Sequence, residues 1–271
     1  MINIPEIFKT KTFNEYPPGK KVHFEEFFHS YYIRNKPETS REYLPVFWTN
    51  FYVSRNYGKN ISDLQALLNN LDKSKKYFTI IDYADGILND ISSLDIKVLS
   101  ASGNGNYNLP LLTMPCKVKP KEDKKIFCSF IGVIKDRHPL REKMQALLKG
   151  RGEYFITEKI NYKEFIDKMN DSIFSLCPRG YGVTSFRICE ALELNSIPVY
   201  IYDEPCVPFS DFVDMKDYCV MIHESELNNI DSILKSKTEK EINILKENGK
   251  KIYEEYFTYE GSSKKIIKHL Q

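Results

Sequence analysis

Two arginines, two glycines and a glutamate surround a single strand-to-helix turn in the stretch SLCPRGYGVTSFRICEAL, residues 175–192. Arg179, Gly180 and Gly182 lie in the loop, and Arg187 and Glu190 follow in the helix-like segment. Loop glycines let a backbone approach a ligand closely, and a helix N-terminus offers unpaired N–H groups that suit phosphate. Guanidinium groups match phosphate oxygens, and a glutamate can accept hydrogen bonds from ribose hydroxyls. The stretch therefore indicates a nucleotide site; the alternative is a surface ion pair between Arg187 and Glu190.

The spacing of this stretch excludes two common phosphate-binding motifs. Gly180-Tyr181-Gly182 is followed by Ser185 where a dinucleotide-binding fingerprint has its third glycine. The Gly-Lys-Ser/Thr of a P-loop is also missing from the stretch.

Short apolar runs alternate with helix-like segments around this turn. Strands are expected at KYFTIID and IKVLSAS, and then at KIFCSFIG, EYFIT, SIFSLC, IPVYIYD and YCVMIHE. Helices are expected at residues 62–74, 138–150, 161–169, 185–194 and 238–257, whereas residues 1–60 are expected to be irregular. The alternation predicts an α/β fold with parallel strands and helices on both faces. Ligands bind beyond the carboxyl ends of such strands, where the loop 178–184 is expected to lie.

Two local patterns help to divide the chain. The lysine-rich segment Cys116–Lys125 has almost no apolar content and is the best candidate for a linker between domains; the alternative is an exposed loop within one domain. Capping boxes are expected where Ser62 precedes Gln65 and where Thr238 precedes Glu241.

Composition excludes several classes of protein. The 271 residues carry a net charge of +2, so bulk charge does not argue for nucleic acid or membrane. No apolar stretch approaches the ~18 residues of a membrane helix, so we expect a soluble protein. The six cysteines form no C-x-x-C pair, and the five histidines show no metal-ligand spacing. We therefore expect free thiols, a reducing compartment and a cytoplasmic or cytoplasm-facing location.

Carboxylates that follow the KYFTIID strand are candidates for a general base. Asp82 and Asp85 lie at its carboxyl end, although Ala84-Asp85-Gly86 is also ordinary turn chemistry. His23, Glu25 and His29 are rivals for this role, with ordinary surface or packed histidines as the alternative for the two imidazoles.

The region around residues 175–192 resembles the exostosin family of glycosyltransferases. The segment FSLCPRGYGVTSFRICEALELNSIPVYIYDEPCVPFSDFVD carries Cys-Pro-Arg-Gly, Ser-Phe-Arg-x-x-Glu-Ala, Ile-Pro-Val and Pro-Phe-Ser at spacing similar to the family's. The resemblance continues through YCVMIHESEL and ends in YEEYF, and it is weaker in YFTIIDYADG and NLPLLTMPC. It covers about the C-terminal half of the chain.

The resemblance implies an inverting transferase that moves a sugar from a nucleoside-diphosphate donor, expected to be a UDP-sugar, to a saccharide acceptor. It implies two Rossmann-like domains that face a cleft, the glycosyltransferase-B fold. Residues 1–118 would form the acceptor-side domain, residues 119–250 the donor domain, and residues 251–271 a helix that packs back on the first domain.

Several residues receive donor-binding roles from the resemblance. Arg187 would contact the diphosphate and Glu190 the ribose, and Arg179, Gly180 and Ser185 would complete this part of the donor site. Many transferases of this fold carry a second glutamate eight positions before the equivalent of Glu190, where this chain has a glycine.

Four further residues are weaker candidates for donor contact. Arg137 and Arg141 could reach the phosphates, with helix-surface arginines as the alternative. Tyr181 could stack on the base or the sugar, with loop packing as the alternative, and Asp203 could contact sugar hydroxyls.

No metal or other cofactor is expected. The sequence Asp82-Tyr83-Ala84-Asp85 is not the D-x-D motif that holds Mn²⁺ on a diphosphate, and arginines with a helix end can neutralise the leaving group instead. A non-catalytic carbohydrate- or nucleotide-binding module and a nucleotide-sugar epimerase remain as alternatives to the transferase.

Overall fold

The structure, a computed structural model, describes residues 1–13, 22–135, 138–158 and 160–271. The chain forms two compact units. Unit 1 contains residues 1–114 and 258–271, and unit 2 contains residues 115–257. Each unit is built around its own parallel sheet, which confirms the α/β class expected from the alternation of strands and helices.

Unit 1 contains a four-stranded sheet in the order β1-β2-β3-β4, with every pair of neighbours parallel. The strands are β1 (Glu42–Tyr43), β2 (Lys76–Ile81), β3 (Asp95–Ser100) and β4 (Tyr107–Asn108). The central strand β2 is buried from its second residue onward. The α-helices of unit 1 are α1 (Phe24–Asn35), α2 (Trp48–Ser54), α3 (Ser62–Asn69) and α9 (Tyr259–Leu270).

The expectation that residues 1–60 are irregular is wrong, because α1 and α2 lie there. Helix α1 buries Phe24, Phe28 and Tyr32, which recur every four residues along one face. The Phe28 ring lies 5.3 Å from the Tyr43 ring and 6.3 Å from the Phe78 ring, measured between centroids. Packing of aromatic side chains on the sheet therefore stabilises a helix whose residue types have only modest helix propensity.

The last residues of the chain, 258–271, belong to unit 1. Helix α8 (Glu239–Ile252) and the π-helical turn at Tyr253–Phe257 end unit 2, and α9 follows in unit 1. Within unit 1 the Tyr259 hydroxyl donates to the carbonyl of Val22 at 2.8 Å, and the Ser40 hydroxyl donates to the carbonyl of Leu270 at 2.6 Å. These bonds fasten both ends of α9 to the N-terminal segment.

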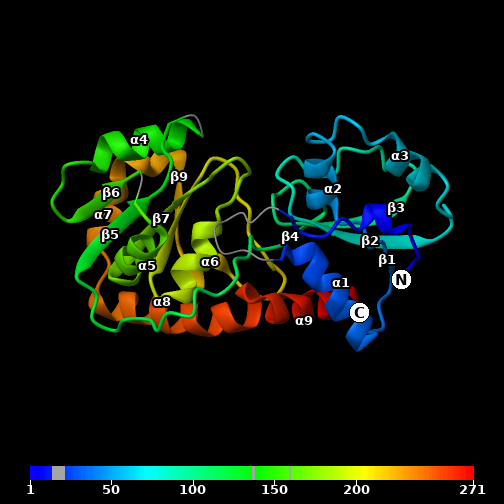
Figure 1. Ribbon diagram of the computed structural model, residues 1–271. Helices are drawn as coiled ribbons and strands as arrows, with labels where there is room; N and C mark the ends of the chain where they lie inside the picture. Colours follow the sequence, from blue (N-terminus) through cyan, green and yellow to red (C-terminus); the bar gives the residue numbers. More distant parts are fainter. Residues whose placement is uncertain (14–21, 136–137, 159) are drawn as a thin grey trace. The chain divides into compact units, whose positions relative to one another are not determined.

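Unit 2 contains a five-stranded parallel sheet in the order β6-β5-β7-β8-β9 (Figure 1). The strands are β5 (Ile126–Ile131), β6 (Tyr154–Thr157), β7 (Ser172–Pro178), β8 (Ile197–Tyr202) and β9 (Val220–His223). The first two strands lie in reversed order, so the chain changes direction across the sheet between β5 and β7. In open α/β sheets this switch point is where ligands bind, at the carboxyl ends of the strands.

Helices α4 (Pro139–Leu148), α5 (Tyr162–Asn170), α6 (Phe186–Glu193) and α7 (Ile230–Lys235) surround this sheet. Leucines and Met144 of α4 pack in one cluster with apolar residues of α7, whereas residues of α5 and α6 form a separate cluster. Right-handed crossovers place α4 on one face of the sheet and α5 and α6 on the other.

The polar segment Cys116–Lys125 opens unit 2, and one of its lysines is buried. Lys124 is 9% exposed, and its ammonium donates to the carbonyls of Asn170 at 2.8 Å and Leu194 at 2.9 Å. These carbonyls belong to the C-terminal ends of α5 and α6, so the lysine ties two helix ends together. Burial lowers the pKa of Lys124 to about 8.

The two expected capping boxes differ in outcome. Thr238 and Glu241 form the reciprocal box at the start of α8. The box at Ser62 is wrong, because the helix is preceded by Ile61 and the Gln65 side chain instead accepts from the backbone N–H of Asp90 at 2.8 Å. In the described part of the chain, no helix is both long and apolar enough to cross a bilayer.

Candidate functional site

The switch point of unit 2 is occupied by Arg187 from the first turn of α6. Its Nη2 donates to the carbonyl of Ile131, the last residue of β5, at 2.5 Å. The guanidinium carbon lies 4.8 Å from the centre of the Phe130 ring. A Cβ atom on Gly132 would come within 2.7 Å of the same Nη2, so a larger residue here would displace the guanidinium. The sequence thus makes room for the guanidinium beside β5.

A second arginine lies behind the turn that follows β7. Arg141 of α4 is 8% exposed, its Nε donates to the carbonyl of Arg179 at 2.9 Å, and its Nη1 donates to the carbonyl of Val133 at 2.7 Å. It therefore joins the loops after β5 and β7. The alternative of a helix-surface arginine is wrong for this residue, whereas Arg137 lies outside the described residues.

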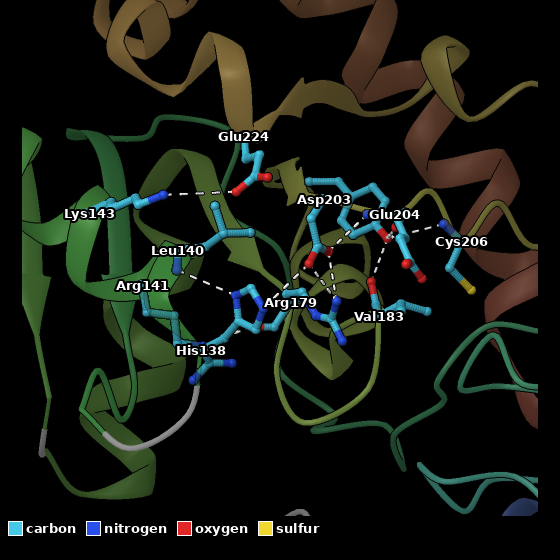
Figure 2. A network of polar contacts seen from close by, with 11 residues as sticks. His138, Leu140, Arg141, Lys143, Arg179, Val183, Asp203, Glu204, Cys206 and Glu224 are labelled. Atoms are coloured by element: carbon cyan, nitrogen blue, oxygen red, sulfur yellow. Dashed lines mark hydrogen bonds and ion pairs between the residues drawn. The ribbon is translucent and has the colours of Figure 1, made fainter.

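Arg179 and Asp203 form an ion pair across the ends of β7 and β8 (Figure 2). The Arg179 Nη1 lies 2.7 Å from both carboxylate oxygens of Asp203, and the backbone N–H of Glu204 donates to the same carboxylate at 2.8 Å. Burial raises the pKa of Asp203, but these hydrogen bonds outweigh it and hold the pKa below its ordinary value. Asp203, which was predicted to contact sugar hydroxyls, thus pairs with Arg179.

The imidazole of His138 lies on the other side of this aspartate. Its Nε2 is 3.4 Å from the Asp203 carboxylate, and its Nδ1 accepts from the backbone N–H of Leu140 at 3.4 Å as the N-cap of α4. His138 is not among the residues predicted from the sequence. Its place directly before Pro139, at the start of a predicted helix and after a strand, was the available signal.

Backbone contacts hold the loop that carries Arg179. The N–H of Gly180 donates to the carbonyl of Thr184 at 3.2 Å, and the buried hydroxyl of Tyr200 donates to the carbonyl of Val183 at 2.6 Å. Ser185 caps α6 by accepting from the N–H of Arg187 at 3.3 Å. The loop is therefore fixed at its base and at its helix end.

Tyr181 lies at the exposed side of this loop. The residue is 72% exposed, so the alternative in which its ring packs against the loop is wrong. The adjacent Gly182 adds no side chain to this surface.

Glu190 forms no ion pair with Arg187, although both residues are described and three positions apart. Arg187 turns to the end of β5, and the glutamate is half-buried on α6. Burial raises the pKa of Glu190; Arg187 lowers it and Glu193 raises it further. The alternative of a surface ion pair is therefore wrong.

The guanidinium groups keep donors available. The buried Nε atoms of Arg179 and Arg187 have no hydrogen-bond acceptor among the described residues. A buried donor without an acceptor costs about 1–3 kcal/mol, more when it is charged. An anion at this edge of the sheet would remove that cost.

The carboxyl edge of the unit 1 sheet carries carboxyl groups instead. Asp82 follows β2, and its backbone N–H donates to a carboxylate oxygen of Glu25 at 2.8 Å. Glu25 is completely buried and also accepts from the backbone N–H and the hydroxyl of Thr49, at 3.0 and 2.7 Å. Burial, followed by the charge of Asp82, raises the pKa of Glu25 to about 8. Glu25 therefore positions the start of the Asp82 turn and has no exposed surface of its own.

The other candidates of unit 1 have simpler environments. Asp85 is exposed in a turn, in which the N–H of Gly86 donates to the carbonyl of Tyr83 at 3.0 Å. His23 is buried as the N-cap of α1, and the ring of His29 lies 5.4 Å from that of Phe47. The two histidines are thus packed groups.

Among the residues that the structure describes, no three His, Cys, Asp or Glu side chains gather in an arrangement that could hold a metal ion. The six cysteines are all free, and five of them are buried.

Residues 104–237 match the family model of the exostosin GT47 domain. This part of the chain is an exostosin-family domain. It includes the arginines at the switch point of unit 2 and the whole segment Cys116–Lys125. The resemblance to the exostosin family that was identified around residues 175–192 is confirmed.

Similar curated proteins match over shorter segments. An exostosin-1 homolog of Caenorhabditis elegans is 30% identical over 93 residues, which is 34% of this chain and 24% of that protein. A probable beta-1,4-xylosyltransferase of Arabidopsis thaliana is 36% identical over 72 residues, 27% of this chain and 17% of that protein. The matched part of this chain thus spans a quarter or less of these relatives.

Solved structures are similar at low identity. TarM has a TM-score of 0.45 at 8% identity, covering 78% of this chain and 53% of that chain. An alpha-glucosyltransferase in complex with UDP and DNA has a TM-score of 0.44 at 12% identity, covering 78% of this chain and 75% of the other. The family assignment therefore rests on the sequence match.

The expected cytoplasmic location is wrong. Exostosin-family glycosyltransferases are enzymes of the Golgi lumen, which conflicts with a cytoplasmic or cytoplasm-facing site. The prediction rested on unpaired cysteines, and buried thiols are inert to disulfide exchange. Their free state therefore does not report the compartment.

Proposed function

We propose that this protein is a glycosyltransferase that uses a nucleoside-diphosphate sugar, with UDP as the nucleotide, and a saccharide hydroxyl as acceptor. The observation that carries the proposal is the gathering of Arg141, Arg179 and Arg187 at the switch point of unit 2, inside the exostosin domain. The relatives named as xylosyl- and glucuronosyltransferases support the same reaction class.

The arginines suit a leaving diphosphate. Arg187 and Arg179 would donate to its oxygens, and Arg141 would hold the Arg179 loop from behind. Guanidinium groups fixed before the reaction stabilise the charge that develops as the bond to the diphosphate breaks. They can supply this charge without a metal ion, so we propose metal-independent transfer.

Glu190 and Tyr181 complete the proposed donor site. Glu190 would accept from the ribose hydroxyls, since its carboxylate is not consumed by an ion pair with Arg187. The exposed Tyr181 ring would lie against the base or the sugar, and Gly180, Gly182 and Ser185 would give the loop its close approach.

The proposed chemistry is a single displacement with inversion. The acceptor oxygen attacks the anomeric carbon, and the bond from that carbon to the diphosphate oxygen breaks, so the diphosphate leaves with the electron pair. The acceptor proton passes to a carboxylate, for which Asp82 and Asp85 of unit 1 are the candidates. We prefer Asp82, because Glu25 fixes its backbone whereas Asp85 lies in an exposed turn.

Product analysis with a panel of UDP-sugars and saccharide acceptors tests the proposal. A transferase releases UDP and forms a glycoside, and NMR of the new linkage reports inversion or retention. Binding of UDP-sugars without turnover on any acceptor would leave a binding module, and interconversion of donors without UDP release would mark an epimerase. EDTA is expected to leave the rate unchanged; complete loss with rescue by Mn²⁺ would contradict metal independence.

A further inference from the structure

His138 joins the arginine site through a carboxylate rather than directly. The Nδ1 atom of its ring accepts from the backbone N–H of Leu140. The neutral imidazole therefore carries its proton on Nε2. The Nε2 atom lies 3.4 Å from the Asp203 carboxylate, and the same carboxylate lies 2.7 Å from the Arg179 guanidinium. Figure 2 shows these three side chains in one line of contacts. Any change in the charge of the imidazole therefore reaches the guanidinium through Asp203.

Charged groups from four elements surround this imidazole. Arg179 and Asp203 face it from the ends of β7 and β8, Arg141 from α4, and Glu224 from the segment after β9. Lys143 of α4 lies 4.0 Å from the Glu224 carboxylate. Burial and the two arginines lower the pKa of His138, whereas Asp203 and Glu224 raise it, and the net direction is down.

We propose that His138 and Asp203 are positioning residues for Arg179 and make diphosphate binding by unit 2 tighter as the pH falls. The inference rests on the proposed function, because it concerns the same donor site. Neither residue needs to touch the donor for this effect.

The physical chain has three steps. Protonation gives the imidazole a positive charge, and Asp203 then neutralises two cations instead of one. The Arg179 guanidinium consequently loses part of its compensation and attracts a diphosphate more strongly. In return, a bound diphosphate favours the protonated imidazole, so the pKa of His138 rises on binding.

A direct test measures UDP-sugar affinity by calorimetry at pH 5.5 and pH 8.0. A UDP-sugar is the right probe because each of its phosphates carries one ester bond and one anhydride bond, which leaves a charge that is constant over this range, whereas the terminal phosphate of UDP titrates. Wild-type protein is expected to bind the tightest member of a panel about fivefold more strongly at pH 5.5. His138→Gln keeps an N–H that can reach Asp203 but does not titrate, so its affinity is expected to change less than about twofold.

Asp203→Asn tests the middle of the chain. It removes the charge through which the imidazole acts on Arg179, so the gain in affinity between pH 8.0 and pH 5.5 is expected to fall below about twofold. A matched control is Asp231→Asn, since Asp231 has the same exposed fraction of 25% and pairs with Arg151 at 2.7 Å beside the beginning of β6. This control is expected to leave the affinity and its pH dependence unchanged.

The outcomes separate the two proposals. An affinity that does not change with pH, or a pH gain that survives in His138→Gln, overturns the role of His138. A pH gain of wild-type size in Asp203→Asn overturns the role of Asp203. If no UDP-sugar binds at either pH, the proposed donor class fails and the inference fails with it.

Discussion

The carboxyl edges of the two parallel sheets carry opposite charges. In unit 2 this edge holds Arg141 and Arg187, which donate to backbone carbonyls at strand ends, and Arg179, which pairs with the carboxylate of Asp203. In unit 1 it holds Asp82 and Glu25, which are linked through a backbone N–H. The architecture is similar, so the residues placed directly after the strands decide which ligand charge each edge attracts.

Each unit also contains a buried ionisable group whose pKa is changed mainly by burial, with opposite consequences. Glu25 accepts three hydrogen bonds in unit 1, and Lys124 donates two in unit 2. Burial is the largest cause of both changes in pKa: it raises that of Glu25 and lowers that of Lys124, each to about 8. The stability of unit 1 should therefore fall as the pH rises toward about 8, and the stability of unit 2 should rise as the pH rises above about 8.

The largest expected effect concerns the acidic edge. Asp82→Asn is expected to lower kcat about 1000-fold, because removal of a general base typically costs 100- to 10000-fold, while UDP-sugar affinity stays within about twofold. Steady-state kinetics and calorimetry on the same preparation measure both quantities. Asp95→Asn is the control, since it breaks an Asp–Arg pair at the first residue of β3. A kcat for Asp82→Asn within threefold of wild type would transfer the role to Asp85, which the variant Asp85→Asn examines.

The basic edge is tested by Arg187→Met, which keeps the length of the side chain over Phe130. Loss of the charged hydrogen bonds is expected to lower kcat/KM about 100-fold. Arg187→Lys is expected to recover little, because a point charge does not replace the planar fork. Arg151→Met, which removes an arginine before β6, should retain wild-type kcat/KM. Equal losses in Arg187→Met and Arg151→Met would show a general loss of folding.

The buried carboxyl of unit 1 gives a stability prediction. Because the folded pKa of Glu25 is raised, its contribution is present below the unfolded pKa near 4.3 and is lost as the pH rises through about 8. The free energy of unfolding of unit 1 should fall by about 2 kcal/mol between pH 5 and pH 8. Trp48, the single tryptophan, is buried in unit 1 and reports its urea unfolding by fluorescence. A slope that persists in Glu25→Gln would contradict the assignment.

The buried lysine of unit 2 gives a smaller change of opposite sign. Because the folded pKa of Lys124 is lowered, its contribution is present above the unfolded pKa near 10.4 and is lost as the pH falls through about 8. The unfolding free energy of unit 2 should rise by about 1 kcal/mol between pH 8 and pH 10. The unfolding of unit 2 is followed by circular dichroism. The part of that signal that changes together with Trp48 fluorescence belongs to unit 1 and is subtracted. Lys124→Met should remove the rise, and its persistence would point to another group.

The sequence predicts unit 2 better than unit 1, for physical reasons. Strands such as Ser172–Pro178 are short apolar runs with turn residues after them, and the helices between them show apolar stripes. In unit 1 the helix Phe24–Asn35 is rich in aromatic residues, and its stability comes from contacts with Tyr43 and Phe78 that no local pattern contains.

The site was predictable in residue types but not in pairings. The motif identified Arg179 and Arg187, and a strand end identified Asp203. The ion pair between Arg179 and Asp203 depends on two strand ends lying side by side. The hydrogen bond from Arg187 to the carbonyl of Ile131 also joins residues that are far apart in sequence. Helical spacing suggested Glu190 as its partner because local spacing was the only geometry available.

The most direct test of the account is a crystal structure of the protein with UDP. The diphosphate is expected to lie at the carboxyl edge of the unit 2 sheet, with its oxygens about 2.7–3.2 Å from the guanidinium nitrogens of Arg179 and Arg187 and the ribose beside Glu190. A UDP molecule bound away from these arginines, at full occupancy and with the Arg179–Asp203 edge unoccupied, would contradict it.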